Sequence, residues 1–141
     1  MADLPISSLL KRGEMKILFV EDDKFLRALL SEKLRTEGYT VMEAENGEEG
    51  ISLVHTGRPH LVLLDLILPG KIDGYELLKQ MKAEPTLSSI PVVIISNLGS
   101  AEDIDRAMNL GAKDFLVKVR NTPQEVVSRI RRIIEESYLR R

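Results

Sequence analysis

Asp65 directly follows an unbroken apolar run, Leu61 to Leu64, and its position is the first sign of chemistry in this chain. The run is too short for a helix and suits a strand that is buried on both faces. A carboxylate is costly to bury without a partner, so the strand should end where Asp65 reaches water, a cation or a cleft. Loops that follow the carboxyl ends of central strands are where open α/β sheets bind ligands. Asp65 is therefore the first candidate functional residue.

Polar side chains also stand at the ends of three other apolar runs. Glu21, Asp22 and Asp23 follow the run at 16–20, Ser96 follows the run at 91–95, and Lys118 lies near the end of the run at 113–119. If the runs are parallel strands, their carboxyl ends meet at one edge of a sheet. The acids, the hydroxyl and the lysine would then lie close to Asp65. Any one of these residues alone is explained as well by a helix cap or a solvated charge. Four strand ends with complementary groups favour a functional site.

Crowded carboxylates repel one another and shift each other's titration unless a cation neutralises them. The chain has no cysteine, and no histidine stands at the carboxyl ends of these runs, so the expected ligands are all oxygen atoms. Such ligands suit Mg²⁺, which prefers one or two carboxylates together with water and phosphate oxygens. With a hydroxyl and a lysine beside it, this set fits phosphoryl transfer. Asp65 would be the nucleophile and would form an aspartyl phosphate.

The surrounding sequence predicts the elements that must position these groups. Five apolar segments are predicted as strands, at 16–20, 39–43, 61–64, 91–95 and 113–119. Five segments with helical periodicity alternate with them, at 24–37, 46–57, 75–84, 101–110 and from Pro123 onward. Thr122 and Glu125 form a capping box at the start of the last helix. The alternation predicts an α/β fold with a doubly wound parallel sheet and helices on both faces.

Composition narrows the class of protein. The 141 residues suffice for one domain with a normal core, which we place at 15–141 after an N-terminal arm at 1–14. A net charge of -2 gives no general attraction to nucleic acid or to an anionic membrane. No apolar run approaches the roughly 20 residues of a spanning helix. We expect a cytoplasmic protein, in which His55 and His60 are structural or solvated.

In combination, the motifs resemble the receiver domain of bacterial two-component response regulators. The matching motifs cover nearly the whole chain after residue 14, and they are Val20-Glu21-Asp22-Asp23, Asp65 with Pro69 and Asp73-Gly74, Ser96, and the segment from Gly111 to Lys118. The resemblance implies a flavodoxin-like fold whose five strands have the order 2-1-3-4-5.

The resemblance also implies a role for each site residue. Asp65 matches the phosphoacceptor, and Lys118 matches the lysine that pairs with the phosphoryl group. The implied Mg²⁺ ligands are the carboxylates of Glu21, Asp22 and Asp65 and the backbone carbonyl of Ile67. Ser96 matches the switch hydroxyl and Phe115 the switch aromatic. Asp23 falls outside the matched pair of acids and is expected to cap a helix.

By the same resemblance, the expected partners are a sensor histidine kinase or a phosphotransfer protein and a downstream protein target. The chain ends soon after the last predicted helix, so we expect a receiver without an output domain that signals by protein contact or phosphate relay, as a monomer or a phosphorylation-linked dimer. It would catalyse only its own phosphoryl transfer and slow dephosphorylation. The alternative is an interaction module that keeps the fold and works without phosphorylation. A phosphohydrolase is disfavoured because Ile67 stands where such enzymes carry a second acid.

The chain departs from the family pattern in three places, and the first two, at Val119 and in the loop after Asp65, keep that alternative open. Val119 follows Lys118 where the family usually has proline, so we expect a trans bond and a re-routed loop. The segment from Asp65 to Asp73 is one residue longer than usual, and Asn97 replaces a smaller residue. Ile67 and Leu98 match positions that influence phosphoryl loss, and neither can orient water by hydrogen bonding. Either the phosphorylated form is long-lived, which a decay assay would measure, or both side chains only pack the loop.

Overall fold

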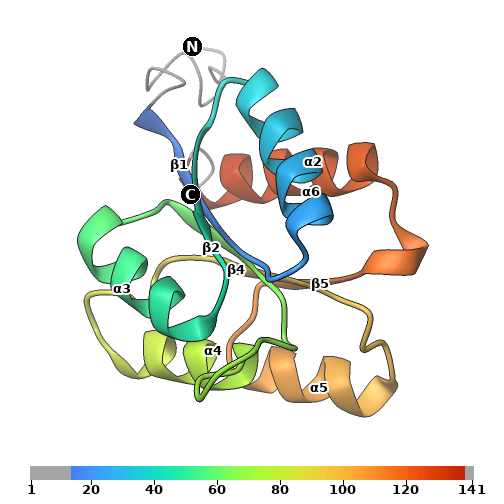
Figure 1. Cartoon of the computed structure of the whole chain (residues 1–141). Coiled ribbons are helices and arrows are strands. Elements are labelled where there is room, and N and C mark those ends of the chain that lie inside the picture. Colours follow the sequence, from blue (N-terminus) through green and yellow to red (C-terminus); the bar gives the residue numbers. More distant parts are fainter. Residues whose placement is uncertain (1–13, 139–141) are drawn as a thin grey trace.

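A computed structural model describes residues 14–138, and the predicted arm lies outside the described residues except for Glu14. One five-stranded sheet forms the centre of the molecule (Figure 1). Its strands are β1 (Lys16–Val20), β2 (Thr40–Ala44), β3 (Leu61–Leu64), β4 (Val92–Ser96) and β5 (Asp114–Val117). Every neighbouring pair is parallel, and the order is β2-β1-β3-β4-β5. The predicted flavodoxin-like order is therefore confirmed.

Helices cover both faces of this sheet, as the alternating pattern predicts. They are α2 (Lys24–Thr36), α3 (Gly47–Gly57), α4 (Gly74–Ala83), α5 (Ala101–Asn109) and α6 (Pro123–Tyr138). Figure 1 shows α2 and α6 on one face and α3, α4 and α5 on the other. In the part of the chain that the structure describes, no helix is long and apolar enough to cross a membrane.

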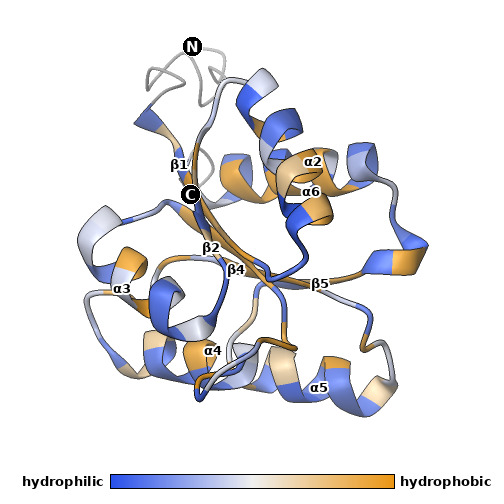
Figure 2. Cartoon of the chain, viewed as in Figure 1, coloured by the Kyte–Doolittle hydropathy of each residue, from blue (hydrophilic) through white to orange (hydrophobic). Residues whose placement is uncertain are grey.

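The three central strands, β1, β3 and β4, bury nearly all their side chains on both faces, which explains why they appear in the sequence as apolar runs. In β3, Leu61 and Leu63 belong to the core layer under α2 and α6, while Val62 and Leu64 belong to the layer under α3, α4 and α5. Figure 2 shows this apolar interior along the sheet, with hydrophilic residues on the outer helix surfaces. The two layers fix the strands and therefore the strand ends that carry the polar groups.

Side-chain caps start the helices where the sequence places them. Asp23 Oδ1 accepts hydrogen bonds from Phe25 N at 3.0 Å and Leu26 N at 3.1 Å, which confirms Asp23 as the cap of α2. The capping box at α6 is also confirmed, because Thr122 and Glu125 exchange two backbone-to-side-chain bonds of 3.2 Å. These caps fix the loops that follow β1 and β5.

The predicted strand at 113–119 is too long at its carboxyl end. β5 stops at Val117, and a short 3₁₀ helix, η2 (Lys118–Arg120), follows. The side-chain amide of Asn121 donates to the carbonyl oxygen of Val117 at 2.9 Å, which ties the turn after β5 to the last residue of the strand. All peptide bonds in residues 14–138 are trans, as expected for the bond before Val119. The Val119 side chain is 80% exposed.

Candidate functional site

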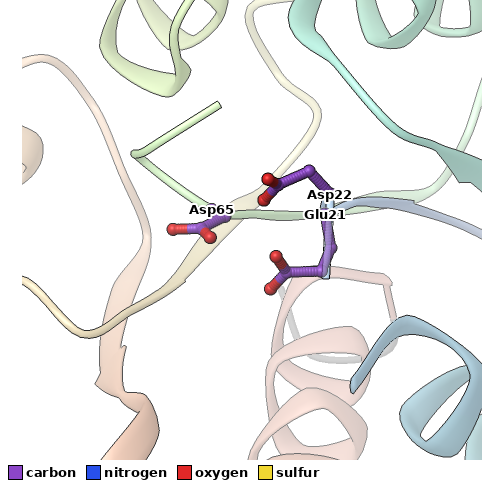
Figure 3. Close-up of side chains that lie close together, drawn as sticks. All are labelled: Glu21, Asp22 and Asp65. Carbon is purple, nitrogen blue, oxygen red and sulfur yellow. The ribbon is translucent and has the colours of Figure 1, made fainter. Parts of the chain in front are cut away.

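Three carboxylates meet at the carboxyl edge of the sheet (Figure 3). Glu21 and Asp22 follow β1, and Asp65 follows β3; Val20 and Leu64 are register partners in these neighbouring strands. One carboxylate oxygen from each of the three acids lies within 4.8 Å of the other two. Glu21 is fully buried and Asp65 is 4% exposed, whereas Asp22 is open to solvent. The structure thus brings together the acids that the sequence assigns to one edge.

Lys118 joins this cluster from the end of β5. Its ammonium nitrogen lies 2.7 Å from Glu21 Oε1 and 2.9 Å from Asp65 Oδ2. The resemblance assigns Lys118 to a phosphoryl group, and the sequence gives no sign that the lysine also bridges two acids. The side chain is only 16% exposed, so these ion pairs are partly shielded from water. One ammonium therefore offsets part of the charge of two of the three carboxylates, Glu21 and Asp65.

The charges of these groups depend on one another. Burial raises the pKa of Glu21 to about 7, although hydrogen bonding to Lys118 and to the Asp23 backbone opposes the shift. Burial alone would lower the pKa of Lys118, but its bonds to Glu21 and Asp65 outweigh this effect and raise it. Burial therefore favours the protonated form of Glu21, and a cation bound beside it would favour the deprotonated form.

Gly74 sets how closely α4 approaches Asp65. Its amide donates to Leu66 O at 3.0 Å. A Cβ atom at this position would lie 2.2 Å from Asp65 O and 2.5 Å from Leu66 Cα. Only glycine therefore allows the helix to start this close behind Asp65. The sequence marks Gly74 as a helix start but does not reveal this contact.

The loop after Asp65 is held by Glu48, at the start of α3. The Glu48 carboxylate accepts hydrogen bonds from Ile72 N at 3.3 Å and from Lys71 N at 3.5 Å. Gly70 has a φ of 91°, which suits glycine, and a Cβ atom there would lie 2.8 Å from Glu48 Oε2. Sequence reasoning missed Glu48, because an acid in the first turn of a helix is usual without any further partner.

The remaining predicted site residues lie in or near the same edge. Ser96 is buried at the end of β4, where its Oγ accepts a hydrogen bond from Leu98 N at 3.3 Å. Phe115 is half-buried and packs on the core layer under α3, α4 and α5. Leu98 packs against the same layer, whereas Ile67 is 56% exposed and its amide donates to Asp65 Oδ1 at 3.2 Å. Packing of the loop therefore accounts for Leu98 but not for the Ile67 side chain.

The three carboxylates fit a hard divalent cation. Mg²⁺ takes oxygen ligands at about 2.1 Å in octahedral geometry, which places neighbouring ligand atoms roughly 3 Å apart and opposite ones roughly 4 Å apart. The observed spread of up to 4.8 Å requires only a small contraction. Because Glu21 is buried with a raised pKa, a second positive charge would relieve an electrostatic cost that Lys118 only partly offsets.

The structure also contains a buried arginine that the sequence analysis did not single out. Arg27 is 7% exposed and lies on the face of α2 that carries Leu30 and Leu34. A cationic residue in register with buried leucines was the available signal, since arginine is almost never fully buried without partners. Arg27 contacts the segment that carries Glu21.

Comparisons with known proteins agree with this geometry. Residues 17–131 match the model of the response regulator receiver domain family. The chain is 37% identical over 123 residues to a probable transcriptional regulator, ycf27, of Galdieria sulphuraria, with 87% of this chain and 46% of that protein covered. It is 31% identical over 122 residues to the DNA-binding dual master transcriptional regulator RpaA of Synechocystis, with 86% and 50% covered.

The fold is similar to that of the Francisella response regulator 1452 receiver domain, with a TM-score of 0.80 and 26% identity over 88% of this chain and 99% of that one. The chain spans about half the length of the curated ycf27 and RpaA relatives. Their matching part, the sheet order and the family match lead to one conclusion: the chain belongs to the response regulator receiver domain family of two-component signalling proteins.

Proposed function

We propose that this receiver accepts a phosphoryl group on Asp65 in a Mg²⁺-dependent reaction. The observation that carries the proposal is the convergence of Glu21, Asp22, Asp65 and Lys118 at one edge of the sheet. Three acids supply metal ligands and a nucleophile, and the lysine supplies a positive charge beside the nucleophile. Phosphoryl transfer depends mainly on positioning and on charge neutralisation, and this set provides both.

In the proposed reaction, a carboxylate oxygen of Asp65 attacks the phosphorus atom of a phosphohistidine. The new O–P bond forms as the N–P bond breaks, and the released imidazole takes up a proton. Lys118, whose ammonium lies 2.9 Å from Asp65 Oδ2, stabilises the negative charge of the transferred group. Glu21, Asp22, Asp65 and the backbone carbonyl of Ile67 would hold Mg²⁺, which neutralises charge on the phosphoryl oxygens when bound.

The phosphoryl donor is proposed to be a sensor histidine kinase or a phosphotransfer protein in the cytoplasm. Ser96 and Phe115 are proposed to report phosphorylation, because their strands β4 and β5 pair side by side at the site and Phe115 packs on the layer under α5. The signal would leave residues 15–141 by contact with a downstream protein, as a monomer or a phosphorylation-linked dimer, and without nucleic-acid binding by this segment.

A second candidate is an interaction module that needs no phosphorylation. The observation that favours it is the position of Lys118, which pairs with both Glu21 and Asp65 and so offsets part of the buried charge without a metal. The re-routed loop at Val119 is a further departure from the family pattern. In this case the fold would present a fixed surface to its partner.

Intact mass after incubation with acetyl phosphate separates the two candidates. The wild type and Asp65→Asn are compared with and without Mg²⁺, and circular dichroism shows that both are folded. If the protein is a working receiver, we expect its mass to increase by one phosphoryl group, and only when both Mg²⁺ and Asp65 are present. A folded wild type that neither binds Mg²⁺ nor gains mass would instead support the interaction module.

A further inference from the structure

Arg27 is buried in α2, one turn after the acidic segment that follows β1, and the guanidinium uses three nitrogen donors. Nη1 donates to the backbone carbonyl of Glu21 at 2.6 Å. Nε donates to Glu43 Oε1 at 3.0 Å, and Nη2 donates to Glu45 Oε1 at 3.2 Å. Arg27 therefore ties together the loop after β1, the end of β2 and the loop that follows β2.

The carbonyl that Arg27 holds belongs to the peptide between Glu21 and Asp22. Because this peptide unit is planar, restraining its oxygen also restrains the Cα atoms of Glu21 and Asp22, from which the two carboxylate side chains extend. Two further bonds restrain the same segment. Glu21 N donates to Ala44 O at 2.9 Å, and Asp23 N donates to Glu21 Oε2 at 3.0 Å. Among these bonds, only the one from Arg27 acts on the carbonyl oxygen between the two acids.

Arg27 contributes little net charge to the cluster of Glu21, Asp22 and Asp65. An unpaired guanidinium beside the acid cluster would weaken the binding of Mg²⁺ there. Its partners Glu43 and Glu45 offset the charge, and Glu43 lies at the edge of the buried guanidinium with only 31% of its side chain exposed. The contribution of Arg27 to the site is therefore one of position and not of electrostatic attraction.

We propose that Arg27 is a positioning residue for cation binding at the acid cluster. It clamps the peptide between Glu21 and Asp22 against the end of β2, so that both carboxylates are oriented before the cation arrives. This inference rests on the proposed function, since it concerns the same Mg²⁺ site. Groups that orient metal ligands from outside the ligand sphere commonly contribute about 10-fold or more to metal affinity.

Arg35 offers a matched control on the same helix. It also pairs with Glu43, at 3.0 Å, and donates to the backbone oxygen of Val41 at 2.9 Å. Arg35 therefore shares an acidic partner with Arg27 and also bonds a backbone carbonyl, but that carbonyl lies in β2 and not between Glu21 and Asp22. Replacement of Arg35, whose side chain is half exposed, removes an ion pair to the same Glu43 and leaves the clamp intact.

The test measures the Mg²⁺ dissociation constant of the wild type, Arg27→Gln, Arg27→Lys and Arg35→Gln by NMR titration, and stability separately by urea unfolding. Arg27→Gln is expected to weaken Mg²⁺ binding about 10-fold, Arg27→Lys less, and Arg35→Gln less than about twofold. Labelling of Arg27→Gln by acetyl phosphate should slow at limiting Mg²⁺ and recover at saturating Mg²⁺.

An unchanged Mg²⁺ dissociation constant in Arg27→Gln, together with lower stability, would overturn the inference and leave Arg27 a structural residue. If Arg27→Gln does not fold, the inference is tested with Arg27→Lys, because lysine keeps the charge but cannot form three directed bonds. A wild-type Mg²⁺ affinity in Arg27→Lys would then overturn the inference. A wild type that binds no Mg²⁺ overturns the proposed function as well. Normal wild-type binding with no effect of either Arg27 substitution removes this inference alone.

Discussion

Replacing Lys118 by methionine removes the ammonium that lies between Glu21 and Asp65 and keeps most of the aliphatic stem. Both acids are almost fully buried, so the substitution leaves two carboxylates without their cation. Removing one partner of a buried ion pair costs about 3 to 5 kcal/mol. Because Lys118 is partly exposed, we expect the lower limit, about 3 kcal/mol, which corresponds to a fall of roughly 10 °C in Tm for a domain of this size.

The loss should depend on pH and on Mg²⁺. The pKa of Glu21 is already raised to about 7, and without the lysine it should rise further. A carboxyl with a raised pKa in the folded state destabilises the fold as pH rises from its unfolded value through the folded pKa. Lys118→Met should therefore lose less stability in mildly acidic buffer than in alkaline buffer, and Mg²⁺ should restore part of the loss.

Urea unfolding of Lys118→Met and of Lys113→Met, with and without Mg²⁺, measures these effects. Lys113 is exposed just before β5 and serves as the matched control. The account requires a large loss for Lys118→Met and a change of less than about 0.5 kcal/mol for Lys113→Met. Equal losses in the two variants would show that the acids do not depend on this lysine. No response of Lys118→Met to Mg²⁺ would show that the unpaired acids do not bind the cation.

Two further predictions concern the histidines and Gly74. The backbone carbonyl of Ile51 and the Glu84 carboxylate raise the pKa of His55, whereas burial lowers that of His60. NMR titration should thus place the pKa values of the two histidines on opposite sides of 6.5. His55 should stabilise the fold below that pH and lose this effect as pH rises through its folded pKa. Protonation of His60 should instead destabilise the fold as pH falls. The same pKa for both histidines would contradict the hydrogen bonding assigned to His55 and the burial assigned to His60. Gly74→Ala should destabilise the domain by at least about 2 kcal/mol, because the added methyl group would overlap the backbone of Asp65, and it should slow labelling by acetyl phosphate. Unchanged stability in urea unfolding and an unchanged labelling rate would refute this close contact.

The apolar runs were sufficient to predict a parallel sheet and the edge where the site forms, whereas the strand order came from the resemblance to receiver domains. Runs buried on both faces, such as Leu61 to Leu64, identify parallel strands, and the polar residue that ends each run marks the carboxyl edge. The cap at Asp23 was predicted because this acid falls outside the pair that the resemblance assigns to Mg²⁺, and an aspartate before a helix is a common cap. The sheet and its edge depend on local periodicity and on the general geometry of parallel sheets.

Contacts between distant segments could not be predicted in this way. Arg27 bonds acids that are 16 and 18 residues away, and Glu48 holds a loop 23 and 24 residues away. Periodicity indicates which helix face is buried but not which partners satisfy a charge on that face. The end of β5 was misplaced because the local pattern does not show that the chain turns into a 3₁₀ helix at Lys118, where the Asn121 side chain donates to the carbonyl oxygen of Val117.

The most direct measurement identifies the residue that carries the phosphoryl group. Protein labelled with acetyl phosphate in the presence of Mg²⁺ is treated with borohydride, which reduces an aspartyl phosphate to homoserine, and the position is found by peptide mass spectrometry. The account predicts homoserine at position 65 alone, and none when Mg²⁺ is omitted. Homoserine at Asp22 or Asp23, or labelling that does not require Mg²⁺, would contradict the assignment of Asp65 as the phosphoacceptor.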